Sequence, residues 1–349
     1  MLNIYRFSAK DIESAVASLK EFLVDTAGAF QKDVSPLPTD IPPELKPLDG
    51  IKAVLFDIYG TLVVSAAGEV GSAKETTDIQ QEEGRPGPKR FSSVLEGAGF
   101  IVKSSAGQRA EQLYFEGIEK CHSELKEKSV LYPEVNIIEI WHRLLTILAE
   151  EGLIREKNES HSFATNTLYD LKISIKAAFF HEVTSNPVSS MPKAKEIVEA
   201  LSENNLSLGI VSNAQFYTPL VLEALFGKSP ERMGFSPELC TWSWKLREAK
   251  PSPGLFEIPL KRLSSTQGIS PAEVLYIGND MRNDILPAKN AGCKAVLFAG
   301  DRRSLRLRTE DDALQALRPD GLITDLSQLI EILPGLELSD RELKNRDYR

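Results

Sequence analysis

Short apolar runs that alternate with helix-length amphipathic segments limit the folds open to this chain more than any other feature. Four runs have the length and content of buried strands: Ala53–Phe56, Leu206–Val211, Val274–Ile277 and Ala295–Phe298. Cys240–Trp244 is a fifth candidate. Helical spacing is seen in Pro192–Glu203, in Leu255–Leu263, which Pro259 should weaken or kink, and in Ile285–Ala291. Strands that alternate with helices predict an α/β fold with a parallel sheet covered on both faces.

A long central segment breaks this alternation. Between Val64 and Pro187 no strand alternation is visible, and helical patterns follow one another instead: Gln108–Leu125, Val135–Glu151 and Thr167–Phe180. Ser65–Arg90 is rich in Gly, Glu, Gln and Ser, which predicts a mobile loop. We therefore expect a helical domain inserted after the first strand. The predicted domains are 1–50, a core of 51–64 and 186–335, an insert of 65–185, and a charged tail of 336–349.

The N-terminal segment combines a helix with a proline-rich connector. Apolar residues recur at helical spacing between Ile12 and Leu23, and Ser8 with Asp11 resembles a capping box. Five prolines lie between Ser35 and Gly50, which predicts a semi-rigid, extended connector. The helix could cover the main body or a second subunit, so a homodimer is a possible arrangement.

Charge and cysteine content exclude several classes of protein. The chain has 41 Lys and Arg against 50 Asp and Glu, a net charge of −9, which argues against a role in gripping nucleic-acid phosphates. It leaves room for a small anionic substrate in a locally positive pocket. Three widely spaced cysteines predict neither a disulfide framework nor a metal site. No signal-like or membrane-spanning apolar run is present, so we expect a cytoplasmic protein without membrane contact.

Polar residues of catalytic type follow the predicted strands in order. Asp57 follows Ala53–Phe56, and Ser212-Asn213 follows Leu206–Val211. Lys250 follows the candidate Cys240–Trp244, and the fourth motif, with Asn279, Asp280 and Asp284, follows Val274–Ile277. Taken singly, each has an ordinary explanation as a cap, a turn or a surface residue. Because the carboxyl ends of parallel strands share one edge of a sheet, the set predicts a single site there.

These motifs resemble the haloacid dehalogenase-like (HAD) hydrolase superfamily over Ile51–Leu62 and about Met191–Leu333. The resemblance implies a Rossmann-like three-layer core with a C1-type helical cap. It also implies Asp57 as nucleophile, Ser212 and Lys250 as phosphoryl ligands, and Mg²⁺. The metal would be held by Asp57, the Tyr59 carbonyl and the acids of the fourth motif. Asn213 would contribute a backbone donor to the phosphoryl group.

Two positions depart from the phosphatases of that superfamily. They usually carry an acid two residues after the nucleophile, where this chain has Tyr59, as the 2-haloacid dehalogenases do. A phenol with a pKa near 10 is a poor general acid at neutral pH. In the fourth motif Asn279 stands where many relatives have an acid, so either Asn279 or Asp280 binds the metal, and carboxylate chemistry favours Asp280. Asp284 is a candidate metal ligand and also an acid at a helix start, and the two roles are compatible.

Three crowded carboxylates need a cation, which favours Mg²⁺ and a phosphoryl substrate. The chain is thus expected to be a Mg²⁺-dependent phosphatase acting through an aspartyl phosphate on Asp57. A 2-haloacid dehalogenase and a non-catalytic binding protein of the same fold are the alternatives.

Two features lie outside the motifs. Four arginines follow the strand that ends at Phe298, and Arg302 or Arg303 could bind an anionic substrate group, although a basic surface turn before a helix at Thr309–Leu317 explains them as well. His142 and His161 lie in the insert, where packing or surface roles are the usual ones. The substrate itself cannot be read from the sequence.

Overall fold

The computed structural model describes residues 7–31, 33–66, 87–157, 163 and 167–336. The chain divides into two compact units. The sheet unit comprises 32–70, 188–214 and 222–349, and the helical unit comprises 1–31, 71–187 and 215–221. Most of the predicted loop 65–90, the predicted tail 339–349 and His161 lie outside the described residues.

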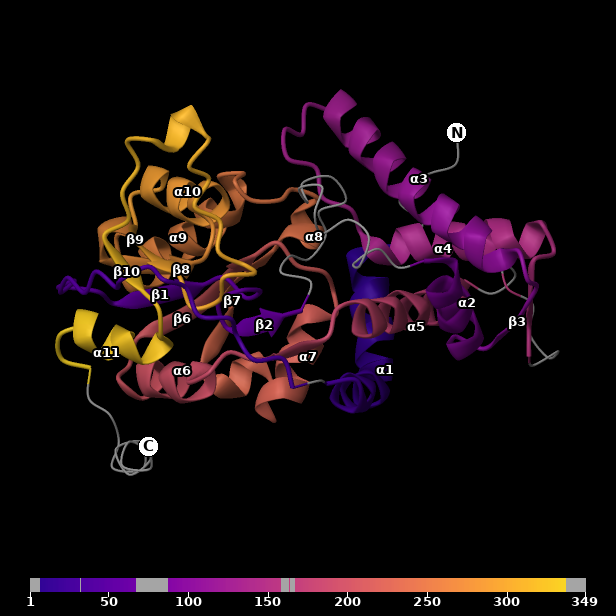
Figure 1. Cartoon of the computed structure of the whole chain (residues 1–349), viewed down its shortest axis with the longest axis horizontal. Coiled ribbons are helices and arrows are strands. Elements are labelled where there is room, and N and C mark those ends of the chain that lie inside the picture. Colours follow the sequence, from indigo (N-terminus) through magenta and orange to yellow (C-terminus); the bar gives the residue numbers. More distant parts are fainter. Residues whose placement is uncertain (1–6, 32, 67–86, 158–162, 164–166, 337–349) are drawn as a thin grey trace. The chain divides into compact units, whose positions relative to one another are not determined.

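The sheet unit is built on six parallel strands in the order β10-β9-β8-β1-β6-β7 (Figure 1). The strands are β1 Ala53–Phe56, β6 Ser207–Ser212, β7 Phe235–Trp242, β8 Val274–Gly278, β9 Lys294–Phe298 and β10 Gly321–Ile323. All four residues of β1 are buried, as expected for a central strand with both faces covered. The predicted α/β fold with its parallel sheet is confirmed.

Helices cover both faces of this sheet. In Figure 1, α9 (Gly254–Gln267) and α10 (Leu286–Asn290) lie on one side, and α6 (Ala194–Glu203) and α11 (Leu329–Ile332) on the other. Helix α7 (Thr218–Phe226) joins the two units in sequence. The helix predicted at Pro192–Glu203 is confirmed as α6, and α9 runs through the buried Pro259 without ending.

Several sequence expectations in the sheet unit were wrong in detail. The fifth strand begins at Phe235 rather than Cys240, and Ser243–Leu246 forms the short helix α8. The helix predicted at Ile285–Ala291 is confirmed as α10, Leu286–Asn290, although a π-turn at Met281–Ile285 precedes it. The helix expected at Thr309–Leu317 is a single 3₁₀ turn, Asp312–Leu314.

The proline-rich connector is extended and bound to the sheet unit. Glu44 and Leu322 exchange two backbone hydrogen bonds, and the Leu48 N–H donates to the Ile332 carbonyl. The Thr39 hydroxyl donates to the Ala299 carbonyl (2.6 Å). The connector therefore forms an additional edge of the sheet unit. An edge position suits a proline-rich segment, because proline has no backbone N–H to donate to a further strand.

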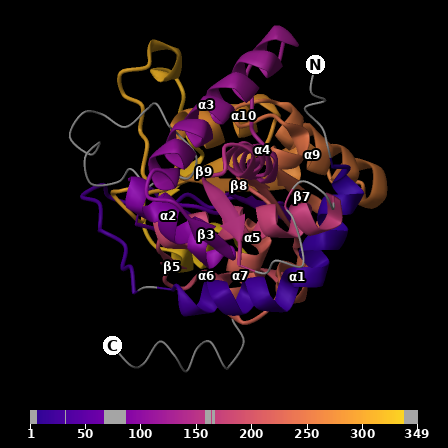
Figure 2. The same cartoon turned by 90° about the vertical axis from the view of Figure 1, so that its right-hand side faces the viewer.

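The helical unit contains α1 Ala9–Ala29, α2 Pro88–Gly97, α3 Ala106–Glu127, α4 Ile137–Glu150 and α5 Thr167–Ser185 (Figure 2). The predicted capping box at Ser8 and Asp11 is present. Phe22 of α1 contacts Phe180 and Lys176 of α5, which places α1 in this unit. The helix and the connector, predicted together as 1–50, thus belong to different compact units.

Short strands also occur where none were expected. β3 (Phe100–Val102) pairs with β4 (Ile154–Glu156) in the helical unit. β2 (Val63–Ser65) pairs with β5 (Val188–Ser190) in the sheet unit, at the two ends of the insert. Three-residue strands carry too few residues to show an alternating pattern.

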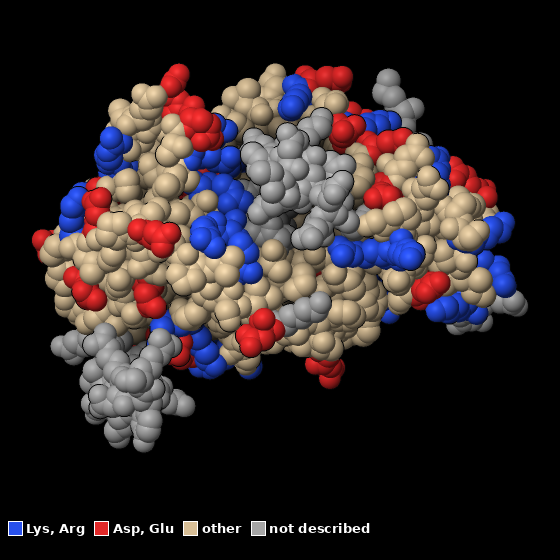
Figure 3. Space-filling model, in the orientation of Figure 1, with Lys and Arg blue, Asp and Glu red and all other residues tan. Residues whose placement is uncertain are grey.

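The surface carries both signs of charge. On the face shown in Figure 3, Lys and Arg atoms of the described residues are interspersed with Asp and Glu atoms. None of the helices described is long and apolar enough for a membrane span.

Candidate active site

Three strand ends of the sheet unit converge at Asp57. β1 lies between β6 and β8, so its carboxyl end is flanked by those of both neighbours. The Asp57 N–H donates to the Ile277 carbonyl (2.9 Å), which extends the pairing with β8 up to the carboxylate. Gly60 then turns the chain with φ +83°, and a Cβ there would come within 2.6 Å of the Ser304 Cβ. Only glycine fits this turn.

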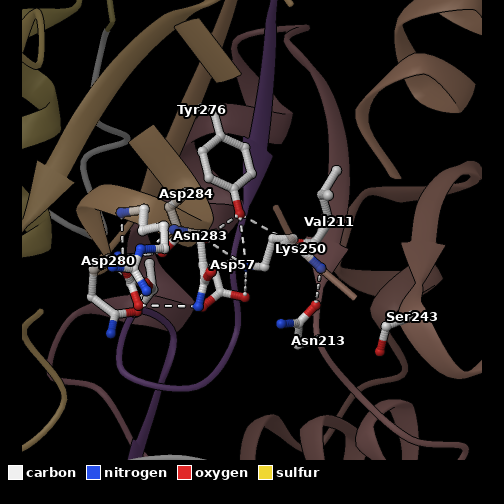
Figure 4. A network of polar contacts seen from close by, with 12 residues as sticks. Asp57, Val211, Asn213, Ser243, Lys250, Tyr276, Asp280, Asn283 and Asp284 are labelled. Atoms are coloured by element: carbon white, nitrogen blue, oxygen red, sulfur yellow. Dashed lines mark hydrogen bonds and ion pairs between the residues drawn. The ribbon is translucent and has the colours of Figure 1, made fainter. Parts of the chain in front are cut away.

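Lys250 is the cation at the centre of the site (Figure 4). Its Nζ lies 2.7 Å from Asp57 Oδ1 and 2.6 Å from Asp284 Oδ1. All three side chains are at least nine-tenths buried. The Lys250 N–H donates to Asn213 Oδ1 (2.6 Å), so Asn213 positions the lysine backbone. The structure therefore brings together residues 57, 213, 250 and 284 from four separate motifs.

Burial and charge oppose each other in this group. Burial alone lowers the pKa of Lys250, but Asp284 and Asp57 outweigh it, and the net pKa is raised. Lys250 therefore remains an ammonium ion at neutral pH. Burial raises the pKa of Asp284 to about 6, against the lowering effect of Lys250.

Tyr276 of β8 is a part of the site that sequence reasoning missed. Its hydroxyl lies 2.9 Å from the Val211 carbonyl and 3.0 Å from Asp284 Oδ1, and accepts a hydrogen bond from Lys250 Nζ (3.1 Å). The signal available was a single polar side chain in the otherwise apolar run Val274–Ile277. This hydroxyl fixes the positions of the Lys250 and Asp284 side chains relative to each other.

Asp284 is held on both of its oxygens. While Oδ1 faces Lys250, Oδ2 accepts from the backbone N–H groups of Asn279 and Asp280, each at 2.9 Å. The carboxylate approaches β8 so closely that a Cβ on Gly278 would lie 2.4 Å from Asp284 Cγ. Glycine at 278 is thus a condition for this arrangement.

Asp280 is likewise engaged by protein groups. Its Oδ1 accepts from the backbone N–H groups of Arg282 (2.8 Å) and Asn283 (3.1 Å). Its Oδ2 lies 3.1 Å from Asn283 Nδ2 and 2.8 Å from Arg308 Nη2. Asp280 therefore forms an ion pair with Arg308, which is not among the predicted site residues.

Asn279 serves as a structural clamp. Its Nδ2 donates to the Ser304 carbonyl (2.6 Å), and its Oδ1 accepts from the Thr61 hydroxyl (3.3 Å). The amide thus ties the turn after β1 to the segment after β9. Both polar atoms of the Asn279 amide therefore already have protein partners, and Asn279 is one of the two residues predicted as a metal ligand.

The donor set, as arranged, does not fit a Mg²⁺ site. Mg²⁺ needs several oxygen ligands in octahedral geometry. Both acids of the fourth motif already have charged and backbone partners on their oxygens. Among the residues that the structure describes, no group of three or more His, Cys, Asp or Glu side chains is placed to hold a metal ion. Lys250 and Arg308 supply the positive charge that the crowded carboxylates were expected to take from a metal.

Other predicted site residues have distinct surroundings. Ser212 is buried, and its Oγ has no hydrogen-bond partner within the described part of the chain. Tyr59 is buried in the turn after β1, where its backbone bridges to Val63. His142 is buried against Phe7 and lies 3.3 Å from the Ser174 hydroxyl, which indicates a packing role.

The two arginines predicted to bind substrate lie on the connector side. The Arg303 guanidinium contacts Asp301 at 3.2 Å and donates to the Ser35 carbonyl (2.5 Å). Arg302 is exposed, and its backbone N–H donates to the Leu37 carbonyl (2.7 Å). Within this arginine-rich segment it is Arg308, rather than Arg303, that extends to the fourth motif. The predicted role of Arg302 or Arg303 in substrate binding stays a prediction.

Known phosphatases are similar in sequence to part or most of this chain. A phosphoglycolate phosphatase of Photorhabdus laumondii is 25% identical over 300 residues, which cover 84% of this chain and 98% of the relative. A ribulose-1,5-bisphosphate 5-phosphatase of Halopiger xanaduensis is 29% identical over 148 residues, 42% of this chain and 57% of the relative. A solved 2-haloacid dehalogenase from Pseudomonas syringae aligns over 81% of this chain and 97% of its own, with 18% identity and a TM-score of 0.47.

The family model described as haloacid dehalogenase-like hydrolase matches residues 51–292, a range that contains Asp57, Ser212, Lys250 and Asp284. This chain belongs to the haloacid dehalogenase-like hydrolase family.

Proposed function

We propose that this hydrolase cleaves a small phosphomonoester through a covalent aspartyl phosphate on Asp57. The observation that carries the proposal is the buried Lys250 ammonium, held 2.7 Å from the Asp57 carboxylate. Ser212 ends the neighbouring strand β6, and its hydroxyl has no hydrogen-bond partner among the described residues. A buried cation and a hydroxyl group suit an anionic phosphoryl group, whose charge lies on its equatorial oxygens. Phosphoglycolate and ribulose 1,5-bisphosphate, which appear in the relatives' names, are small phosphomonoesters.

The reaction divides into two displacements. An Asp57 oxygen attacks phosphorus, the phosphorus–oxygen ester bond breaks, and the leaving alkoxide takes a proton from solvent water to become the alcohol. Water then attacks the aspartyl phosphate, which releases inorganic phosphate and restores the carboxylate. Lys250 stabilises the phosphoryl charge in both steps, and Asp284 and Tyr276 fix its position. Tyr59 is a weak acid for the leaving alcohol, so phosphoesters with good leaving groups should react faster.

Three finer features stay predictions from the sequence: a Mg²⁺ requirement, a cytoplasmic location and a homodimer. Where HAD phosphatases use Mg²⁺, the metal supplies positive charge to the phosphoryl oxygens. In this chain a metal at Asp280 requires that Arg308 first release the carboxylate.

The proposal is tested with a panel of phosphomonoesters assayed for phosphate release, with Mg²⁺ and with EDTA. We expect at least one small phosphorylated acid or sugar to be hydrolysed, and Asp57→Asn to lose that activity. If no phosphomonoester is hydrolysed in either condition while 2-haloacids release halide, the phosphatase proposal is overturned.

A second candidate reaction, dehalogenation of a 2-haloacid, is favoured by Tyr59. Halide leaves without protonation, so this chemistry has no need of an acid at that position. The same Asp57 would attack carbon and form an ester that water cleaves. Halide release from 2-chloropropionate that resists EDTA would identify this reaction.

A further inference from the structure

Arg308 forms a shielded ion pair with Asp280, an acid of the fourth motif. Its Nη2 lies 2.8 Å and its Nε 3.4 Å from the two carboxylate oxygens of Asp280. The arginine and aspartate side chains are only 13% and 8% exposed. A guanidinium that approaches both oxygens of a shielded carboxylate forms one of the stronger kinds of ion pair.

Backbone hydrogen bonds hold the segment that carries Arg308 close to the fourth motif. The Met281 N–H donates to the Arg306 carbonyl and the Arg306 N–H to the Asn279 carbonyl, both at 2.9 Å, which fastens the arginine segment to the fourth motif. Two residues later, Arg308 itself adopts φ +53°, the left-handed region that residues with a side chain rarely occupy. Such a conformation persists where the surrounding contacts hold it.

We propose that Arg308 is a tethered counterion that competes with divalent metal for Asp280, so that this chain binds Mg²⁺ more weakly than its acidic motif suggests. For the metal to reach Asp280 the guanidinium must leave a carboxylate it already neutralises, and it remains nearby as a like charge. A tethered competitor acts at high effective concentration, which lowers apparent metal affinity without changing the ligands. This inference concerns the same site but does not rest on the phosphatase reaction.

The test is direct binding of Mn²⁺, followed by electron paramagnetic resonance without substrate, to the full-length protein and its Arg308→Gln variant. We expect Arg308→Gln to bind Mn²⁺ at least tenfold more tightly than the wild type. In the Asp280→Asn background the same change should have little effect, because the carboxylate contested by both cations is gone. Arg262→Gln removes an exposed ion pair with Glu238 and serves as the control for the loss of one positive charge.

Thermal melts establish that each variant is folded. If Arg308→Gln does not fold, Arg308→Lys keeps the charge but loses the planar fork, and it should tighten Mn²⁺ binding severalfold. Equal Mn²⁺ affinity in the wild type and in the folded Arg308 variant would overturn the proposal. Tightening of the same size in Arg262→Gln would also overturn it, since the effect would then be one of net charge.

Discussion

Asp57 tests the covalent mechanism at the scale of one residue. Asp57→Asn replaces one carboxylate oxygen by an NH₂ group, so the side chain keeps its size but loses its negative charge and its nucleophilicity. We expect turnover to fall to background, while the melting temperature shifts little because Asp284 still pairs with Lys250. Steady-state rates and thermal unfolding measure the two effects, with Asp49→Asn on the exposed connector end as control. Near-normal turnover in Asp57→Asn would exclude Asp57 as the nucleophile.

Tyr276 tests whether Lys250 needs its second anchor. Tyr276→Phe removes the hydroxyl that joins the Val211 carbonyl, Asp284 and Lys250. We expect a loss of about 1–3 kcal/mol in the free energy of unfolding, because buried partners are left unsatisfied. We expect kcat to decrease by a larger factor than KM changes, because Lys250 would be mispositioned in the transition state. Tyr132→Phe, at an exposed position, should change neither quantity. An unaltered kcat would mean that the carboxylates and Asn213 position Lys250 without the Tyr276 hydroxyl.

Part of this site could be predicted from sequence because strand order does the positioning. Asp57, Lys250 and Asp284 follow apolar runs, and parallel strands place their carboxyl ends at one edge whatever the details of packing. Tyr276 could not be foreseen in the same way, since its role depends on how its hydroxyl reaches across from β8 to β6. Arg308 depends on the pairing of Arg306 with the fourth motif, a tertiary contact with no local signal.

At the scale of elements, periodicity predicts long segments and tertiary pairing decides short ones. α3 and α4 each extend beyond three turns, and their apolar spacing revealed them. The segment Thr309–Leu317 carries a helical pattern but forms one 3₁₀ turn, in a stretch that follows directly on the tertiary pairing at Arg306. β10 has three residues and is recognised as a strand only through its pairing with β9 and Glu44.

Helix α5 carries a buried histidine that should make the protein sensitive to acid. His181 is surrounded by the rings of Phe91, Tyr114 and Trp141 at 4.9–5.5 Å, and burial, with a smaller contribution from Arg90, lowers its pKa to about 3. In the unfolded chain its pKa is about 6.5, so the unfolded state binds more protons between these values. Stability should therefore fall as the pH drops below about 6.5 and be unaffected above it.

The measurement is urea unfolding of the wild type and His181→Phe at pH 7 and pH 5.5. We expect the wild type to lose about 1 kcal/mol more than the variant over this interval. The His181→Phe substitution removes no hydrogen bond at Nε2, because this nitrogen has no partner among the described residues. His122→Gln, on the less buried surface of α3, is the control and should follow the wild type. Parallel losses in wild type and His181→Phe would show that His181 takes up its proton in the folded state.

At the scale of the whole molecule, the first helix belongs energetically with the insert. Leu23 of α1 is fully buried, and its neighbour Phe22 packs on Phe180 of α5. Leu23→Ala should cost about 2–5 kcal/mol, the usual range for a buried leucine, and that cost should fall on the helical unit. Hydrogen exchange measures where it falls: protection should decrease in α5 and stay nearly constant in β1 and β8 of the sheet unit. Glu21→Ala, exposed on the same helix, should leave both units unchanged. An equal loss of protection in β1 and α5 would mean that the two units unfold together. The division of the fold at the ends of the insert would then not separate two independently stable units.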